Sequence, residues 1–97
     1  MSTRPVQGTT DVIRPGDNNN VVSYYSGDPV TVTVPFGLPA GFQAVLKQMG
    51  AGAVTVAAGD GVTVENRQSH TGTAGQYAVI CLLGDPEGPF VLSGDTA

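Results

Sequence analysis

The sequence predicts an all-β domain: a small antiparallel β-sandwich or barrel of about seven short strands, preceded by an extended N-terminal arm. Two observations carry this prediction. Apolar and polar residues alternate in short runs, which is the period of a half-buried strand, and glycine or proline interrupts these runs at close intervals. Both signals are densest over residues 38–64, LPAGFQAVLKQMGAGAVTVAAGDGVTV. A chain of 97 residues is expected to form one domain with a modest core.

Residues 1–20 differ in composition from residues 21–97, which we interpret as the single β domain. The segment MSTRPVQGTTDVIRPGDNNN holds two prolines, two glycines and three asparagines, and RPGDNNN is a strong turn signal. We therefore expect an extended arm that is flexible on its own, with one short adhesive element near its end. The candidate partner-binding residues of the arm are Val12, Ile13 and Arg14.

Strand signals begin after the arm. Residues 21–25, VVSYY, are β-branched and aromatic, and residues 30–34, VTVTV, place valines on one face and threonines on the other. Residues 42–48 fit both helical and strand spacing. Because Gly41 and Gly50 confine that segment to eight residues, which is short for a helix, we favour a strand.

Two glycine-containing turns divide the next strands. Residues 50–52, Gly-Ala-Gly, lead into a strand at 53–57, and residues 59–61, Gly-Asp-Gly, lead into one at 62–65. Asp-Gly is a favoured hairpin dipeptide because its turn needs positive φ. The polar residues 66–76 are expected to form a loop.

The strand predicted at residues 77–83 is apolar on both of its faces. Such a strand is covered twice, by its own core and by a second sheet, the arm or another subunit. A wide turn at 84–89 and a last strand at 90–93 follow. Tyrosine is favoured at interfaces because it is rigid and amphipathic. The candidate subunit-interface residues are Tyr25, Tyr77, Ile80 and Leu82.

Composition narrows the classes of partner. Charged residues make up 12% of the chain, and the four basic ones are scattered, so we expect no nucleic-acid binding. Cys81 is the single cysteine, so no internal disulfide can form. The start MSTRPVQG lacks the apolar core of a secretory signal, and the longest apolar run, residues 78–83, is too short to span a bilayer. We therefore expect a soluble protein, made in a cytoplasm, with no membrane partner.

Catalytic chemistry is not indicated. The single histidine, His70, lies in a polar loop, and no nucleophile-elbow sequence accompanies it. One histidine and one cysteine are too few for a zinc site. Aspartates that follow glycines fit turn chemistry and lack the spaced ligand series of a calcium loop. We therefore predict a non-enzymatic protein with no catalytic residues, no metal and no cofactor.

Several motifs are similar to a small β domain of tailed-bacteriophage virion proteins, found in capsid-decoration, head-fibre and tail-fibre proteins. The resemblance covers about residues 30–97 and leaves the arm outside. It implies a non-enzymatic and frequently trimeric module, and no functional residues carry over, because the matching positions are turns and core. The matching runs are residues 38–42 (LPAGF), 50–52 (GAG) before 54–56 (VTV), 59–64 (GDGVTV), 75–78 (GQYA) and 91–95 (VLSGD).

The resemblance, with the economy of one small domain, leads to a first hypothesis of a capsid decoration (cement) protein. It would bind the major capsid protein on the outer surface of the virion as a homotrimer and stabilise the shell. The arm could add a strand to a sheet edge of the capsid protein. The alternative is a tail-fibre or head-fibre module that binds host-surface glycans, with Tyr24, Asn66 and His70 as the contacts.

Overall fold

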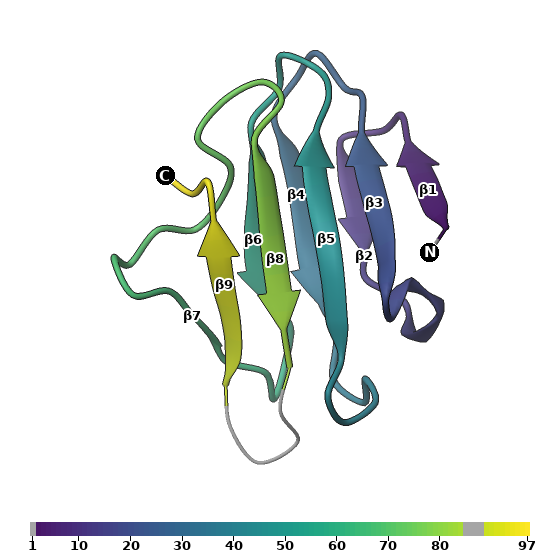
Figure 1. The fold of residues 1–97 in the computed structure, drawn as a ribbon, viewed down its shortest axis with the longest axis vertical. Coiled ribbons are helices and arrows are strands. Elements are labelled where there is room, and N and C mark those ends of the chain that lie inside the picture. The colour runs from purple at the N-terminus through teal and green to yellow at the C-terminus, as the bar shows by residue number, and fades with distance from the viewer. Residues whose placement is uncertain (1, 85–88) are drawn as a thin grey trace.

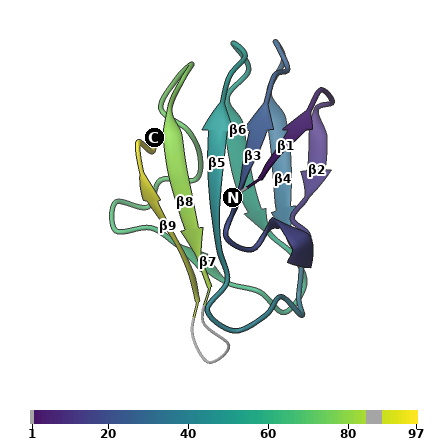
Figure 2. The same cartoon turned by 45° about the vertical axis from the view of Figure 1, so that its right-hand side comes forward.

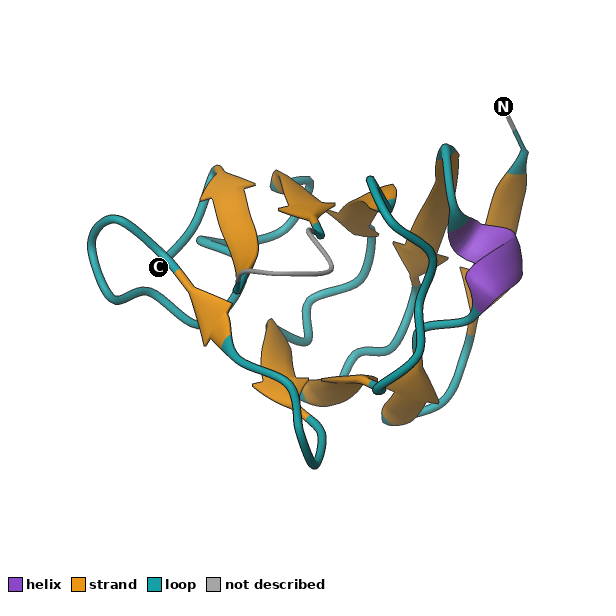
Figure 3. Ribbon diagram, turned by 90° about the horizontal axis from the view of Figure 1, so that it is seen from below, coloured by secondary structure: helices purple, strands orange, loops and turns teal. Residues whose placement is uncertain are grey.

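The computed structural model describes residues 2–84 and 89–97 of the chain. These residues form nine β-strands in two sheets and one turn of 3-10 helix, η1 (Pro15–Asp17). The two sheets lie face to face (Figure 1), and the view from below shows the two rows of strands with η1 at one end (Figure 3). The all-β prediction is confirmed.

The two sheets differ in size. The six-stranded sheet contains, in spatial order, β1 (Thr3–Val6), β3 (Asn20–Tyr24), β5 (Gln43–Gln48), β8 (Val79–Leu83), β9 (Phe90–Gly94) and β7 (Val64–Glu65). The three-stranded sheet contains β2 (Thr10–Val12), β4 (Val30–Val34) and β6 (Val54–Ala58). All seven strands that the sequence predicts are present within two residues of the expected bounds, and the strand interpretation of residues 42–48 is confirmed.

The pairing of the strands differs from the prediction. β1, β3 and β5 are parallel neighbours in one sheet, and β2, β4 and β6 are parallel neighbours in the other. The chain therefore winds in three coils, β1–β2, β3–β4 and β5–β6, which stack like the turns of a short solenoid. The prediction of an antiparallel sandwich or barrel is therefore wrong. Antiparallel pairing is found between β5 and β8 and between β8 and β9.

The Gly-Ala-Gly turn shows why the coils stack so closely. The amide of Gly50 donates to the carbonyl oxygen of Tyr24 at 3.1 Å, and the amide of Gly52 donates to that of Ser26 at 3.0 Å. A Cβ atom on Gly52 would lie 1.8 Å from the carbonyl oxygen of Asp28. These glycines therefore let the corner of the third coil rest directly on the corner of the second.

The hairpin expected at residues 59–61 is absent from the described strand pairs. A turn does form there, closed by a 3.1 Å hydrogen bond from the Val62 amide to the Gly59 carbonyl, and Gly61 has a φ of 76°. The following strand, β7, pairs with β9 and not with β6. The Asp-Gly dipeptide therefore marks a coil corner. The expected wide turn at 84–89 falls mainly on residues 85–88, outside the described residues.

The core lies between the two sheets and is built from side chains in register. Val22, Leu46 and Ile80 are successive partners across β3, β5 and β8, and each is fully buried. Phe42 is also fully buried and meets the ring of Phe90 edge to face, with centroids 6.3 Å apart. Stacking of this kind gives each coil an apolar partner above and below it.

The N-terminal segment also differs from the prediction of a flexible arm. Residues 3–6 pair with β3 and residues 10–12 pair with β4, so the N-terminal segment forms the first coil. The alternation of apolar and polar residues is interrupted in this segment because Arg4 and Asp11 occupy inward positions, which apolar residues fill in the other strands. Each strand is also only three or four residues long.

No described helix is long and apolar enough to cross a membrane.

Phe42→Ala should lower the free energy of unfolding by about 3–5 kcal/mol, because a fully buried aromatic ring leaves a cavity when it is removed. Urea denaturation measures the loss. Phe36→Ala is the control, since Phe36 is 81% exposed and its removal should change stability by less than about 0.5 kcal/mol. Equal losses in the two variants would contradict the burial of Phe42.

Gly52→Ala should destabilise the chain by about 1–3 kcal/mol or more, because the new methyl group must push against the backbone of Asp28. The matched control is Gly27→Ala in the neighbouring corner, where no atom lies within 4 Å of the added Cβ. Thermal melting distinguishes the two variants. Similar melting temperatures for both would show that the coil corners are not in close contact.

Candidate functional site

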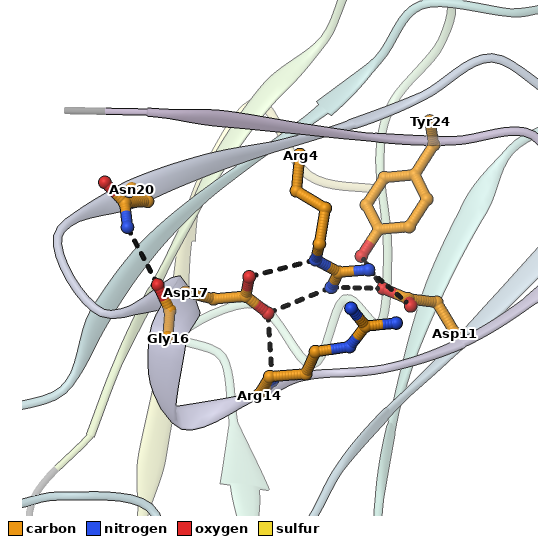
Figure 4. A network of polar contacts seen from close by, with 7 residues as sticks. All are labelled: Arg4, Asp11, Arg14, Gly16, Asp17, Asn20 and Tyr24. Atoms are coloured by element: carbon orange, nitrogen blue, oxygen red, sulfur yellow. Dashed lines mark hydrogen bonds and ion pairs between the residues drawn. The ribbon is translucent and has the colours of Figure 1, made fainter.

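A cluster of charged side chains closes the N-terminal end of the solenoid (Figure 4). Arg4 points inward from β1 and meets Asp11 of β2 and Asp17 of η1. Both carboxylates are almost fully buried, whereas Arg4 keeps 21% of its side chain exposed. Tyr24 reaches the same cluster from β3. The cluster therefore joins both sheets and the 3-10 turn at one end of the core.

The guanidinium of Arg4 has two-point contacts with both acids. Its two Nη atoms each donate to Asp11 at 2.9 Å. Nε donates to Asp17 at 3.0 Å and Nη2 donates to the same carboxylate at 2.9 Å. Asp17 also accepts the backbone amide of Arg14 at 2.9 Å, which fixes the start of η1. Such paired hydrogen bonds hold a planar guanidinium in one orientation.

The charges in this cluster shift each other's protonation. Hydrogen bonds to Asp11 and Asp17 raise the pKa of Arg4 above its usual value. Burial acts to raise the pKa of Asp11, but the hydrogen bonds from Arg4 and Tyr24 and the Arg4 charge outweigh it, so the pKa lies below 3.8. Burial and the bond to Asp11 raise the pKa of the Tyr24 hydroxyl, which donates to Asp11 at 2.8 Å. Asp11 thus stays ionised and Tyr24 stays protonated.

The cluster has the properties of a group that stabilises the fold. Four of the five N–H bonds of Arg4 are occupied by carboxylate oxygens. Within the described residues, no group of three or more histidine, cysteine or acidic side chains could hold a metal ion. An ion pair held by this many hydrogen bonds orients the surrounding backbone.

The three residues predicted to bind a partner are placed differently from one another. Val12 is 52% exposed at the end of β2, and Arg14 is exposed just beyond it. The prediction that Ile13 binds a partner is wrong, because its side chain lies fully inside the core and cannot contact a partner there. Alternation along an extended strand explains the difference, since neighbouring side chains point to opposite faces.

The predicted subunit-interface residues also divide into two groups. Tyr25 and Tyr77 are exposed, and they lie at the same end of the six-stranded sheet, after β3 and before β8. The prediction that Ile80 and Leu82 lie in a subunit interface is wrong, because both side chains are fully buried between the sheets. Both faces of β8 are apolar, so the sequence could not indicate which one faces the core.

The exposed apolar side chains of this region lie on the opposite face of β8. Val79 and Leu83 point outward, each 45% exposed, and Val91 of β9 lies beside Leu83 in the strand register. A shallow hollow adjoins Leu83 and is lined in part by Val45 and Cys81. The outer face of the six-stranded sheet therefore carries an apolar row that crosses two strands.

The three residues considered for glycan binding are not brought together. Tyr24 is buried and bonded to Asp11. The Asn66 side chain donates to the carbonyl oxygen of Leu92 in β9, and β9 lies three places from the strand of Tyr24, roughly 14 Å at normal strand spacing. Asn66 accepts the amides of Gln68 and His70 at 2.8 and 3.0 Å. The His70 ring pairs with the Thr96 hydroxyl at 2.9 Å. Asn66 and His70 therefore organise their own loop.

Comparison of the chain with protein-family models, with curated proteins and with solved structures finds no match.

Asp11→Asn should lower stability at neutral pH by about 1–3 kcal/mol, because Arg4 loses a charged partner. The lowered pKa of Asp11 means that its contribution is present above about pH 4 and is lost as the pH falls through the folded-state pKa. The variant should therefore lose less stability on acidification than the unmodified chain. Urea titrations at several pH values measure both effects.

The control is Asp60→Asn, which changes the same charge in an exposed corner. It should leave stability at neutral pH unchanged within about 0.5 kcal/mol. An Asp11→Asn variant as stable as the Asp60→Asn variant would show that the ion cluster does not lock the first coil.

Proposed function

We propose that this chain is a non-enzymatic structural protein of a tailed-phage virion. In this proposal it is a capsid decoration protein, which binds the major capsid protein on the outer surface as a homotrimer and stabilises the shell. The observation that carries the proposal is the apolar row Val79, Leu83 and Val91 on the outer face of the six-stranded sheet. Exposed apolar side chains that gather on one face are typical of protein–protein contact surfaces.

Other features support a protein-binding role. The outer face of the three-stranded sheet carries the threonines 10, 31, 33 and 55. Among residues 10–12, 30–34 and 54–58, none of the side chains that point outward is charged. Tyr25 and Tyr77 add two amphipathic rings at one end of the other sheet. The resemblance to phage virion domains covers β4 and β6 but leaves β2 outside, and the trimeric state follows from that resemblance.

Leu83→Glu should break the proposed oligomer, because it places a charge in the middle of the apolar contact. Light scattering on a size-exclusion column should give a trimer for the unmodified chain and a monomer for the variant. Binding to capsids of the encoding phage that lack this protein should fall in parallel. The measurement should be made over a range of protein concentrations.

Gln68→Glu is the control, since it adds the same charge to an exposed loop position outside both sheets. It should keep the trimer and the capsid occupancy. An unmodified chain that stays monomeric at high concentration, or capsids that never bind it, would overturn the proposal.

A second candidate is a fibre module that binds host-surface glycans. The observation that favours it is Tyr77, which is 67% exposed and has a φ of 70°. A bulky residue held in this region of φ is unusual, and such strain gathers at binding sites. Binding to a glycan array without any capsid, abolished by Tyr77→Ala, would favour this candidate over decoration.

A further inference from the structure

The edges of the two sheets are protected in every place but one. A strand at the edge of a sheet presents unpaired N–H and C=O groups, and proteins commonly blunt such edges with proline, charge, short strands or covering segments. Four edge strands occur in the described chain: β1 and β7 in the six-stranded sheet, and β2 and β6 in the three-stranded sheet. Their backbone hydrogen bonds show which of them remains open.

The edge at β1 is blunted by proline. The amides of Val21 and Tyr25 donate to the carbonyl oxygens of Ser2 and Val6, so the alternate residues Thr3 and Pro5 direct their backbone groups outward. Pro5 has no N–H group to offer. A strand added along β1 would lose its central donor.

The edges at β6 and β7 are closed in other ways. Residues 71–73 cover β6, where the amide of Val56 donates to Thr71 at 2.7 Å and the amide of Thr73 donates to Val54 at 2.9 Å. β7 is only two residues long and ends in the charged Glu65. Neither edge therefore offers a row of free backbone groups.

The edge at β2 is open. The Thr31 amide donates to the Thr9 carbonyl at 3.0 Å, and the Ile13 amide donates to the Thr33 carbonyl at 3.0 Å. Alternation then directs the N–H and C=O groups of Thr10 and Val12 away from β4. No described residue forms a backbone hydrogen bond with them on that side, and β2 is the last strand of its sheet (Figure 2).

The surroundings of this edge indicate the chemistry of its partner. Val12 is exposed, and the guanidinium of Arg14 has no hydrogen bond or ion pair among the described residues. A hollow of about 380 Å³ lies over the outer face of β2 and β4, next to this edge. Its lining is Thr10, Asp11, Val12, Arg14, Thr31 and Thr33. Because the carboxylates of the Arg4 cluster are already satisfied, Arg14 is the cation at this edge that pairs with no described acidic group, and it favours an acidic partner.

We propose that the β2 edge accepts an extended, acidic segment of the capsid protein as a fourth strand of the three-stranded sheet. Main-chain hydrogen bonds to Thr10 and Val12 give the affinity, and a carboxylate beside Arg14 gives the selectivity. This inference rests on the proposed function and reverses the direction of strand exchange: this chain supplies the edge and the capsid protein supplies the strand.

Val12→Pro tests the backbone contact directly. It removes an N–H that no described backbone carbonyl accepts, although this N–H also interacts with the Asp11 carboxylate, while the neighbouring Ile13 amide still bonds to β4. Cosedimentation with capsids that lack this protein should show binding weakened by about tenfold or more, since a central hydrogen bond is lost and the ring obstructs the edge. Val12→Thr, which keeps the N–H, should bind like the unmodified chain.

Arg14→Glu tests the charge and should weaken binding by about tenfold, because it replaces attraction with repulsion. Arg67→Glu makes the same change at another exposed arginine and should have no effect. Hydrogen exchange gives a readout that needs no variant: the amides of Thr10 and Val12 should exchange freely in the free protein and slowly on the capsid. Equal melting temperatures for the four variants show that each remains folded.

The outcomes separate the two proposals. If the unmodified chain binds capsids and Val12→Pro binds equally well, or if both amides stay unprotected on the capsid, strand addition is wrong and decoration stands. If the unmodified chain does not bind at all, both proposals fail. Loss in Val12→Pro and Arg14→Glu, with binding kept in both controls, supports strand addition.

Discussion

The close contact between the corners of successive coils determines much of this structure. Gly50 and Gly52 place the third coil directly on the backbone of the second, and their amides bond to its carbonyl groups. That contact sets the parallel register of β3 with β5 and of β4 with β6. The register in turn places Val22 on Leu46 and Val30 on Val54 in the core. A side chain at either glycine would separate the coils and disturb every layer at once.

The two ends of the solenoid are finished by different physical means. At one end β8 turns antiparallel against β5, and residues 71–73 bond to β6, so no further coil can stack. At the other end Arg4, Asp11 and Asp17 place an ion cluster in the space that a core would fill. A complete extra coil stacked there would have to bury these charges more deeply, which is costly. A single strand beside β2 leaves the exposed side of Arg4 in water.

The strands could be predicted from the sequence, but their partners could not. A period of two is the same in parallel and antiparallel sheets, so VTVTV indicates β4 without naming β2 and β6 as its neighbours. The first coil was missed because Arg4 and Asp11 interrupt the apolar alternation that would reveal β1 and β2. The apolar faces of β8 were found, yet only packing shows that Ile80 faces inward and Leu83 outward.

The ion cluster links these observations. The inward Arg4 bonds to the carboxylates of Asp11 and Asp17, and Tyr24 donates to Asp11, so the cluster draws β2, η1 and β3 together at one end. That convergence bonds β2 to β1 and β3 through side chains although it is only three residues long. A rigid edge loses little conformational entropy when a partner strand pairs with it. The same charges that interrupt the apolar alternation of the first coil therefore also position the strand whose edge we propose as a binding site.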